Sequence, residues 1–247
     1  MRLLVIVMLL SVVPGFGGEG KSVVYTIGDK KFEGYFADAG KKAPFILLIH
    51  DWDGLTDYEV QRSEMFKKLG YTVFAADLFG KGIRPKALED KKRLTGALYA
   101  DRTAMRTLMN GAIEAARSNG AAVENGVAIG YCFGGAAVLE LARAGVPLKG
   151  FITFHGGLAT PEGQGYTKTK GKVLILHGSA DQAVPVEQFT ALAGELEKAH
   201  VDHEMILYGG ADHAFTVFGG ERYNREADKK SWNRCTGFLK ELFGVSE

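Results

Sequence analysis

One cysteine of the chain stands in a setting that could make its thiol a nucleophile. Cys132 is the centre of Gly130-Tyr131-Cys132-Phe133-Gly134, between a predicted strand and a predicted helix. This G-x-C-x-G pattern is typical of a nucleophile elbow, a sharp turn in which glycines prevent collisions between the flanking strand and helix. A thiol at the start of a helix is also favoured as thiolate by the helix dipole. The alternative is a small buried cysteine beside a Gly-rich helix contact.

An acid and a histidine follow this cysteine along the chain. Asp181 comes after the predicted strand Val173–Leu176, and His213 comes after a strand around Met205–Tyr208. Nucleophile, acid and histidine in this order, each past the carboxyl end of a strand, are typical of the α/β-hydrolase architecture. We therefore predict Cys132 as nucleophile, His213 as general base and later acid, and Asp181 as the group that orients the imidazole.

The remaining histidines and the second cysteine are weaker candidates. Asp212 adjoins His213 and is expected to point elsewhere, and Cys235 lies on the apolar stripe of the last helix. No histidine pair has the spacing or the further ligands of a zinc site, so no metal is expected. His50 and His177 end predicted strands and are expected to be structural or to line a pocket, as His155 could. His200 and His203 are expected in a polar turn.

Acyl transfer also requires donors for an oxyanion. In this architecture one donor is the N–H after the nucleophile, here that of Phe133, and the second comes from the loop after an earlier strand. The loop Asp51–Leu55 follows a predicted strand that ends at His50, and the Trp52 N–H is the candidate second donor.

The elements that would position these residues alternate along the chain. Unbroken apolar runs suit strands that are buried on both faces of a parallel sheet, and amphipathic segments between them predict helices. A hairpin of Val23–Ile27 and Phe32–Phe36 precedes this alternation. The predicted fold is an α/β-hydrolase fold with a mainly parallel sheet between helices. Strands are predicted at 45–50, 71–76, 127–130, 151–154 and 173–176, and helices at 58–69, 88–117, 135–144, 186–199 and 224–243.

Composition and the first residues set the wider limits. The chain has 247 residues, of which 46% are hydrophobic, and a formal charge of +1, which argues against a nucleic-acid partner. Residues 1–18 have the basic start, short apolar run and turn of a secretory signal, with a buried first strand or helix as the alternative. We expect a single domain over residues 19–247, without a membrane span, exported to the periplasm or the medium as a monomer or small homo-oligomer.

With these motifs the chain resembles the dienelactone hydrolase family of α/β-hydrolases. The resemblance implies hydrolysis of esters or lactones, a small-molecule substrate and no cofactor. It also implies an acidic residue close to the resting thiol, and the matching position is Asp51, one methylene shorter than the usual glutamate. The resemblance rests on His50–Leu55, Asp77-Leu78-Phe79, Gly130–Gly135, His177-Gly178-x-x-Asp181 and His213-Ala214-Phe215.

The substrate-binding positions depart from the family pattern. The resemblance to dienelactone hydrolases proper implies two arginines that bind the substrate carboxylate. Here Lys81 lies near the first position and Val217 near the second. Because a planar bidentate donor is lost, dienelactone itself is expected to be a poor substrate.

Two other functions are compatible with the same residues. A catalytically idle protein could use the fold to bind a small ligand, although such a protein would not need all three triad residue types. Acyl transfer to an acceptor other than water would use the same three side chains as hydrolysis.

Overall fold

The computed structural model describes residues 18–244. The predicted secretory signal over residues 1–18 therefore lies, apart from Gly18, outside the described residues. The described residues form two compact units, divided between Gly126 and Val127, which we describe one at a time.

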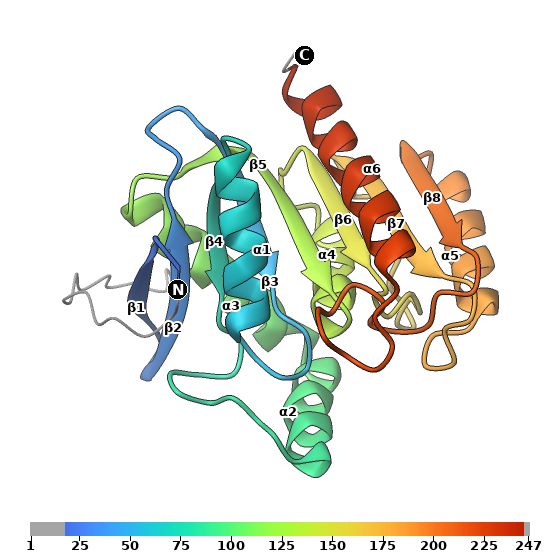
Figure 1. The fold of residues 1–247 in the computed structure, drawn as a ribbon, viewed down its shortest axis with the longest axis horizontal. Helices are drawn as coiled ribbons and strands as arrows, with labels where there is room; N and C mark the ends of the chain where they lie inside the picture. Colours follow the sequence, from blue (N-terminus) through green and yellow to red (C-terminus); the bar gives the residue numbers. More distant parts are fainter. Residues whose placement is uncertain (1–17, 245–247) are drawn as a thin grey trace. The chain divides into compact units, whose positions relative to one another are not determined.

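The first unit contains four strands in the order β1-β2-β4-β3 (Figure 1). The predicted hairpin is present, with β1 and β2 antiparallel, and β2 is also antiparallel to β4, whereas β3 and β4 are parallel. Every residue of β4 is buried, as the unbroken apolar run predicts. The bounds are β1 Lys21–Ile27, β2 Lys30–Ala37, β3 Pro44–Ile49 and β4 Thr72–Ala76.

The helices of the first unit show one error in the sequence prediction. The single helix predicted over 88–117 is two helices, α2 Leu88–Ala100 and α3 Arg102–Ser118. Asp101 separates them because its backbone leaves the helical conformation, with φ −117° and ψ 83°, and its carboxylate accepts the Ala104 N–H at 2.8 Å, which makes it the N-cap of α3. The other helix, α1 Asp57–Lys68, begins with a capping box formed by Thr56 and Glu59.

The second unit contains parallel strands in the order β5-β6-β7-β8 (Figure 1). The division between the units falls within β5, and its part from Val127 onward pairs with β6. Helix α4 packs on β6, and α6 packs on β6 and β7. The strands are β5 Ala122–Tyr131, β6 Gly150–Phe154, β7 Lys172–Gly178 and β8 His203–Tyr208, and the helices are α4 Phe133–Arg143, α5 Val186–Lys198 and α6 Arg225–Phe243.

The register of the second unit aligns the carboxyl ends of its strands. Tyr131 of β5 pairs with Phe154 of β6, and Phe154 pairs with Leu176 of β7. The loops that follow these strands therefore start from one edge of the sheet, where open α/β sheets build their sites. Within residues 18–244 no helix combines the length and apolar character that a bilayer crossing requires.

Candidate active site

Cys132 lies on a turn that only a special backbone conformation can make. Its φ is +50° and its ψ is −114°, outside the conformations that a side chain ordinarily allows. The turn joins β5 to α4, and Cys132 is the N-cap of α4. A strained residue at the start of a helix is the geometry that the G-x-C-x-G pattern predicts.

The flanking glycines are required by close approach of the backbone. A Cβ placed on Gly130 would lie 2.1 Å from the Gly134 carbonyl oxygen, and one on Gly135 would lie 2.7 Å from the Gly156 Cα. Real carbon atoms do not approach backbone atoms so closely, so a side chain at either position would push α4 away from the sheet. The glycines thus hold Cys132 at the edge of the sheet.

Cys132, His213 and Asp181 lie in hydrogen-bonding contact within the second unit. The Nε2 atom of His213 is 3.0 Å from the Sγ of Cys132, and its Nδ1 atom is 2.8 Å from Asp181 Oδ2. These residues are 81 and 32 positions apart from His213 along the chain, so only the fold brings them together. Cys132 is half-buried, whereas His213 and Asp181 are buried.

The surroundings of His213 favour its protonated form. Burial alone lowers the pKa of His213, but hydrogen bonds to Asp181 and Cys132, with the charges on both, raise it to about 10. Burial acts to raise the pKa of Asp181, yet the contact with His213 holds it below its ordinary value. The trio therefore suits an imidazolium that lies between the Cys132 sulfur and the Asp181 carboxylate.

The loop after β7 fixes the Asp181 carboxylate. Its Oδ1 atom accepts the backbone N–H groups of Ala183 and Val184 at 2.9 and 2.8 Å, which leaves Oδ2 for His213. The neighbouring Asp212 accepts the His213 backbone N–H at 2.6 Å instead of contacting the ring. The acid that meets the imidazole is thus Asp181, as the sequence predicts.

Two other histidines lie beside this trio. His155 is buried, its ring centroid is 5.5 Å from that of His213, and its Nε2 atom is 2.7 Å from Thr216 Oγ1. His177 donates from Nε2 to the Val184 carbonyl at 2.8 Å, and burial lowers its pKa. Both are parts of the wall around His213, in line with the strand-end and pocket-wall places expected for them.

The other predicted site residues divide between the units. Phe133 is the first residue of α4, directly after Cys132, whereas Asp51, Trp52 and Lys81 belong to the first unit. The Asp51 carboxylate accepts the Asp53 N–H at 2.8 Å. Lys81 is exposed, and its backbone N–H donates to the Lys31 carbonyl.

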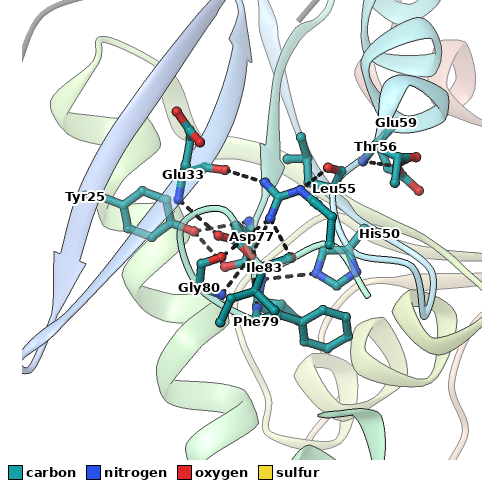
Figure 2. Close-up of polar contacts among 12 residues, drawn as sticks. Tyr25, Glu33, His50, Leu55, Thr56, Glu59, Asp77, Phe79, Gly80 and Ile83 are labelled. Atoms are coloured by element: carbon teal, nitrogen blue, oxygen red, sulfur yellow. Dashed lines mark hydrogen bonds and ion pairs between the residues drawn. The ribbon is translucent and has the colours of Figure 1, made fainter. Parts of the chain in front are cut away.

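Sequence reasoning missed a second polar cluster, which lies in the first unit (Figure 2). Arg84 donates to the backbone carbonyls of Leu55 and Ile83, and its guanidinium lies 3.6 Å from the buried Asp77 carboxylate. Glu59 is completely buried at the start of α1. An arginine three residues after Lys81, in a loop rich in glycine and proline, was the available signal for this cluster.

Of the residues assigned to the core or to a polar turn, Cys235 and His200 lie where they were expected, whereas His203 does not: it is the half-buried first residue of β8, where its Nδ1 atom lies 2.7 Å from the Val201 carbonyl oxygen. Cys235 of α6 is completely buried, and His200 is exposed. Among residues 18–244, no group of three or more His, Cys, Asp and Glu side chains is arranged to hold a metal ion.

The chain matches known proteins over most of its length. The model of the dienelactone hydrolase family matches residues 32–243. A structure named m3DLH is 32% identical with a TM-score of 0.83, covering 91% of this chain and 98% of the other. A dienelactone hydrolase-like promiscuous phosphotriesterase from metagenomic libraries is 31% identical with a TM-score of 0.82, covering 90% and 98% of the two chains.

Two relatives assigned as carboxymethylenebutenolidases differ in how much they share with the chain. The Synechocystis protein is 25% identical, and the match covers 90% of this chain and 96% of the relative. The Saccharolobus solfataricus protein is 34% identical, but the match covers only 47% of this chain and 44% of the relative. Together with the family match, these similarities establish an α/β-hydrolase fold, and the chain belongs to the dienelactone hydrolase family.

Proposed function

We propose that the chain hydrolyses small carboxylic esters or lactones through a thioester on Cys132. The observation that carries this proposal is the continuous contact from Cys132 Sγ through the His213 imidazole to Asp181, at 3.0 and 2.8 Å. Membership of a hydrolase family supports the reaction class. The side chains supply the nucleophile, the proton carrier and the orienting acid of acyl transfer.

The proposed reaction has two halves. The Cys132 thiolate attacks the substrate carbonyl and forms an S–C bond, and the ester C–O bond breaks as the leaving alcohol takes a proton from the His213 imidazolium. Water then attacks the thioester while His213 accepts its proton, and the carboxylic acid leaves as the thiolate re-forms. The backbone N–H of Phe133, directly after Cys132, is the proposed donor to the oxyanion in both halves, and a second donor from Trp52 stays a prediction from the sequence.

Covalent labelling tests the nucleophile. Iodoacetamide should alkylate Cys132 in the native protein, and His213→Ala should remove most of that reactivity because the thiolate loses its imidazolium partner. Mass spectrometry of the labelled peptides measures the rate at each cysteine. Cys235→Ser is the matched control, since Cys235 is buried in α6 and its loss should leave labelling unchanged. Equal labelling of both cysteines, insensitive to His213→Ala, would contradict the proposal.

Substrate preference is a separate prediction. Lys81 and Val217 lie near the sequence positions that the family resemblance assigns to two arginines, and Arg84, three residues after Lys81, already contacts backbone carbonyls and Asp77. We therefore expect aryl and alkyl esters without a carboxylate to react faster than dienelactone, measured as kcat/KM on purified protein. Dienelactone turnover equal to that of p-nitrophenyl acetate would show that the missing arginines are unimportant.

A further inference from the structure

The loop that carries His213, residues 209–217 after β8, contains a strained backbone position. Ala214, the residue after His213, has a φ of +62°, a left-handed conformation that a side chain disfavours. The turn is closed by a hydrogen bond from the Val217 N–H to the Ala214 carbonyl at 3.0 Å. A strained residue persists only where its surroundings hold it, so the contacts of its neighbours determine where the His213 side chain lies.

Two side chains of this loop contact His155, a buried residue directly after β6. The His155 Nε2 atom lies 2.7 Å from the Thr216 Oγ1 atom. The His155 ring also meets the Phe215 ring edge to face, with the centroids 5.3 Å apart and the planes at 79°. Phe215 and Thr216 are both completely buried. His155 therefore anchors the two residues that follow the strained Ala214.

His155 contacts the His213 ring as well. The two ring centroids are 5.5 Å apart and the planes are at 65°. The nitrogens of His213 meet Asp181 and Cys132, and both contacts form together only at one rotation of the ring. A reactive side chain keeps such a geometry when its neighbours restrict its rotamers. His155 restricts His213 directly, through the ring contact, and indirectly, through the loop.

His155 is in turn fixed to the sheet. Its backbone N–H donates to the carbonyl of Leu176 in β7 at 2.8 Å. Strand β6, which leads to His155, lies between β5, which leads to Cys132, and β7, which leads to Asp181. The contact to Thr216 also tolerates either tautomer of the ring, because a hydroxyl can donate or accept. A rigid element thus holds a loop that has no regular structure.

We propose that His155 is a positioning residue that, through its hydrogen bond with Thr216, holds the His213 imidazole against Cys132. This inference rests on the proposed function, in which His213 carries the proton of the reaction. The role requires no contact between His155 and the substrate. It is important because a displacement of a reacting group by about 1 Å can slow catalysis by about 100-fold.

Two substitutions remove the hydrogen bond from opposite sides. Thr216→Val keeps the shape of the side chain and loses the hydroxyl, whereas His155→Phe keeps an aromatic ring and loses the nitrogens. Each single change leaves a buried polar group without this partner, which lowers stability. The double variant has apolar groups on both sides and should recover most of that stability. Thr216→Ser keeps the hydroxyl and is the matched control.

The first measurement is the acylation rate, followed as the pre-steady-state burst of p-nitrophenolate from p-nitrophenyl acetate. We expect Thr216→Val, His155→Phe and the double variant to acylate about 10- to 100-fold more slowly than wild type, and Thr216→Ser to stay within about threefold. Urea denaturation should show the recovered stability of the double variant. If its acylation rate recovered together with its stability, His155 would act only in packing and the inference would be overturned.

The second measurement is alkylation by iodoacetamide at pH 7 and pH 10. An unassisted thiol, with a pKa of about 8.5, is about 3% ionised at pH 7 and almost fully ionised at pH 10. If the imidazole is displaced, Thr216→Val should react more slowly than wild type by up to about 30-fold at pH 7 but at nearly the wild-type rate at pH 10. An equal loss at both pH values would contradict the inference, because it would indicate hindered access to the sulfur.

Failure of the proposed function gives a different result. If the wild-type protein shows no burst that disappears in Cys132→Ala, the proposed function is wrong and this inference falls with it. A burst that depends on Cys132 but is equally fast in wild type, Thr216→Val and His155→Phe would overturn the inference alone. Equal losses in Thr216→Ser and Thr216→Val would do the same, because the hydroxyl would then have no part in the effect.

Discussion

Asp77 in the first unit and Asp181 in the second share one local structure but end on different partners. Both are buried, and the Oδ1 atom of each accepts the backbone N–H groups two and three residues further along the chain. The second oxygen differs. In Asp77 it accepts the Glu33 backbone N–H at 3.1 Å, whereas in Asp181 it faces the His213 ring at 2.8 Å.

The histidines of the two regions differ in the same way. Both ring nitrogens of His50 contact backbone groups, and burial keeps the ring neutral. Both ring nitrogens of His213 contact ionisable side chains, which raise its pKa. A buried histidine such as His50, whose ring nitrogens contact backbone groups, can hold a loop in place. A histidine such as His213, which contacts a thiol and a carboxylate, can also transfer a proton.

The largest expected effect is the loss of activity when Asp181 is replaced. Asp181→Asn keeps an oxygen for the two backbone N–H groups but presents an amide to His213, which favours the wrong tautomer. We expect kcat to fall by about 10³- to 10⁴-fold, while the free energy of unfolding changes by about 1 kcal/mol or less. Ester hydrolysis and urea denaturation on the same preparation measure both. A kcat within tenfold of wild type would remove Asp181 from the proposed triad.

Asp77→Asn should affect the free energy of unfolding more than kcat. An amide in place of the second oxygen would oppose the Glu33 N–H and weaken the ion pair with Arg84. We expect the free energy of unfolding to fall by about 2–4 kcal/mol, with a proportionally smaller change in kcat at a temperature where the variant is folded. If Asp77→Asn abolished activity without loss of stability, the two aspartates would not differ as described.

The smallest effect concerns the pH dependence of stability at Glu59. Burial raises the pKa of Glu59 to about 8, helped by the charge of Asp51, although hydrogen bonds from Thr56 act in the opposite direction. The folded protein thus binds this proton more tightly than the unfolded chain, so the stability it contributes is complete below about pH 4.5 and is lost as the pH rises towards 8.

Glu59→Gln cannot titrate and serves to isolate this contribution. Between pH 5 and pH 8 we expect the unfolding free energy of the wild type to fall, relative to that of Glu59→Gln, by about 1 kcal/mol or more. Subtracting the variant removes the changes due to His50 and His213, which titrate in both proteins. A difference that stays constant over this range would show that Glu59 has an ordinary pKa.

The sequence predicted the parts of this protein that follow from local pattern. Unbroken apolar runs identified the buried strands, and Gly130 with Gly134 around Cys132 identified the elbow because tight turns of this kind require glycine. The order of Cys132, Asp181 and His213, which follow β5, β7 and β8, sufficed to place them at one edge of the sheet, where the structure brings them into contact.

The unpredicted features depend on contacts between distant segments. The division of the helix predicted over 88–117 required knowing that Asp101 would cap α3 instead of continuing a turn. The hydrogen bonds of Arg84 end on backbone carbonyls, which every residue carries, so no residue pattern identifies them in advance. The hydrogen bond from the Leu78 N–H to the His50 ring likewise joins residues 28 positions apart.

The contrast between the chain's two cysteines gives a way to count folded molecules. Cys132 is half-buried at the start of α4, whereas Cys235 is completely buried in α6. A thiol reagent should therefore find one sulfur in each native molecule and two in each unfolded one. The stoichiometry of modification then reports the folded fraction of a sample, with no need for an added dye or tag.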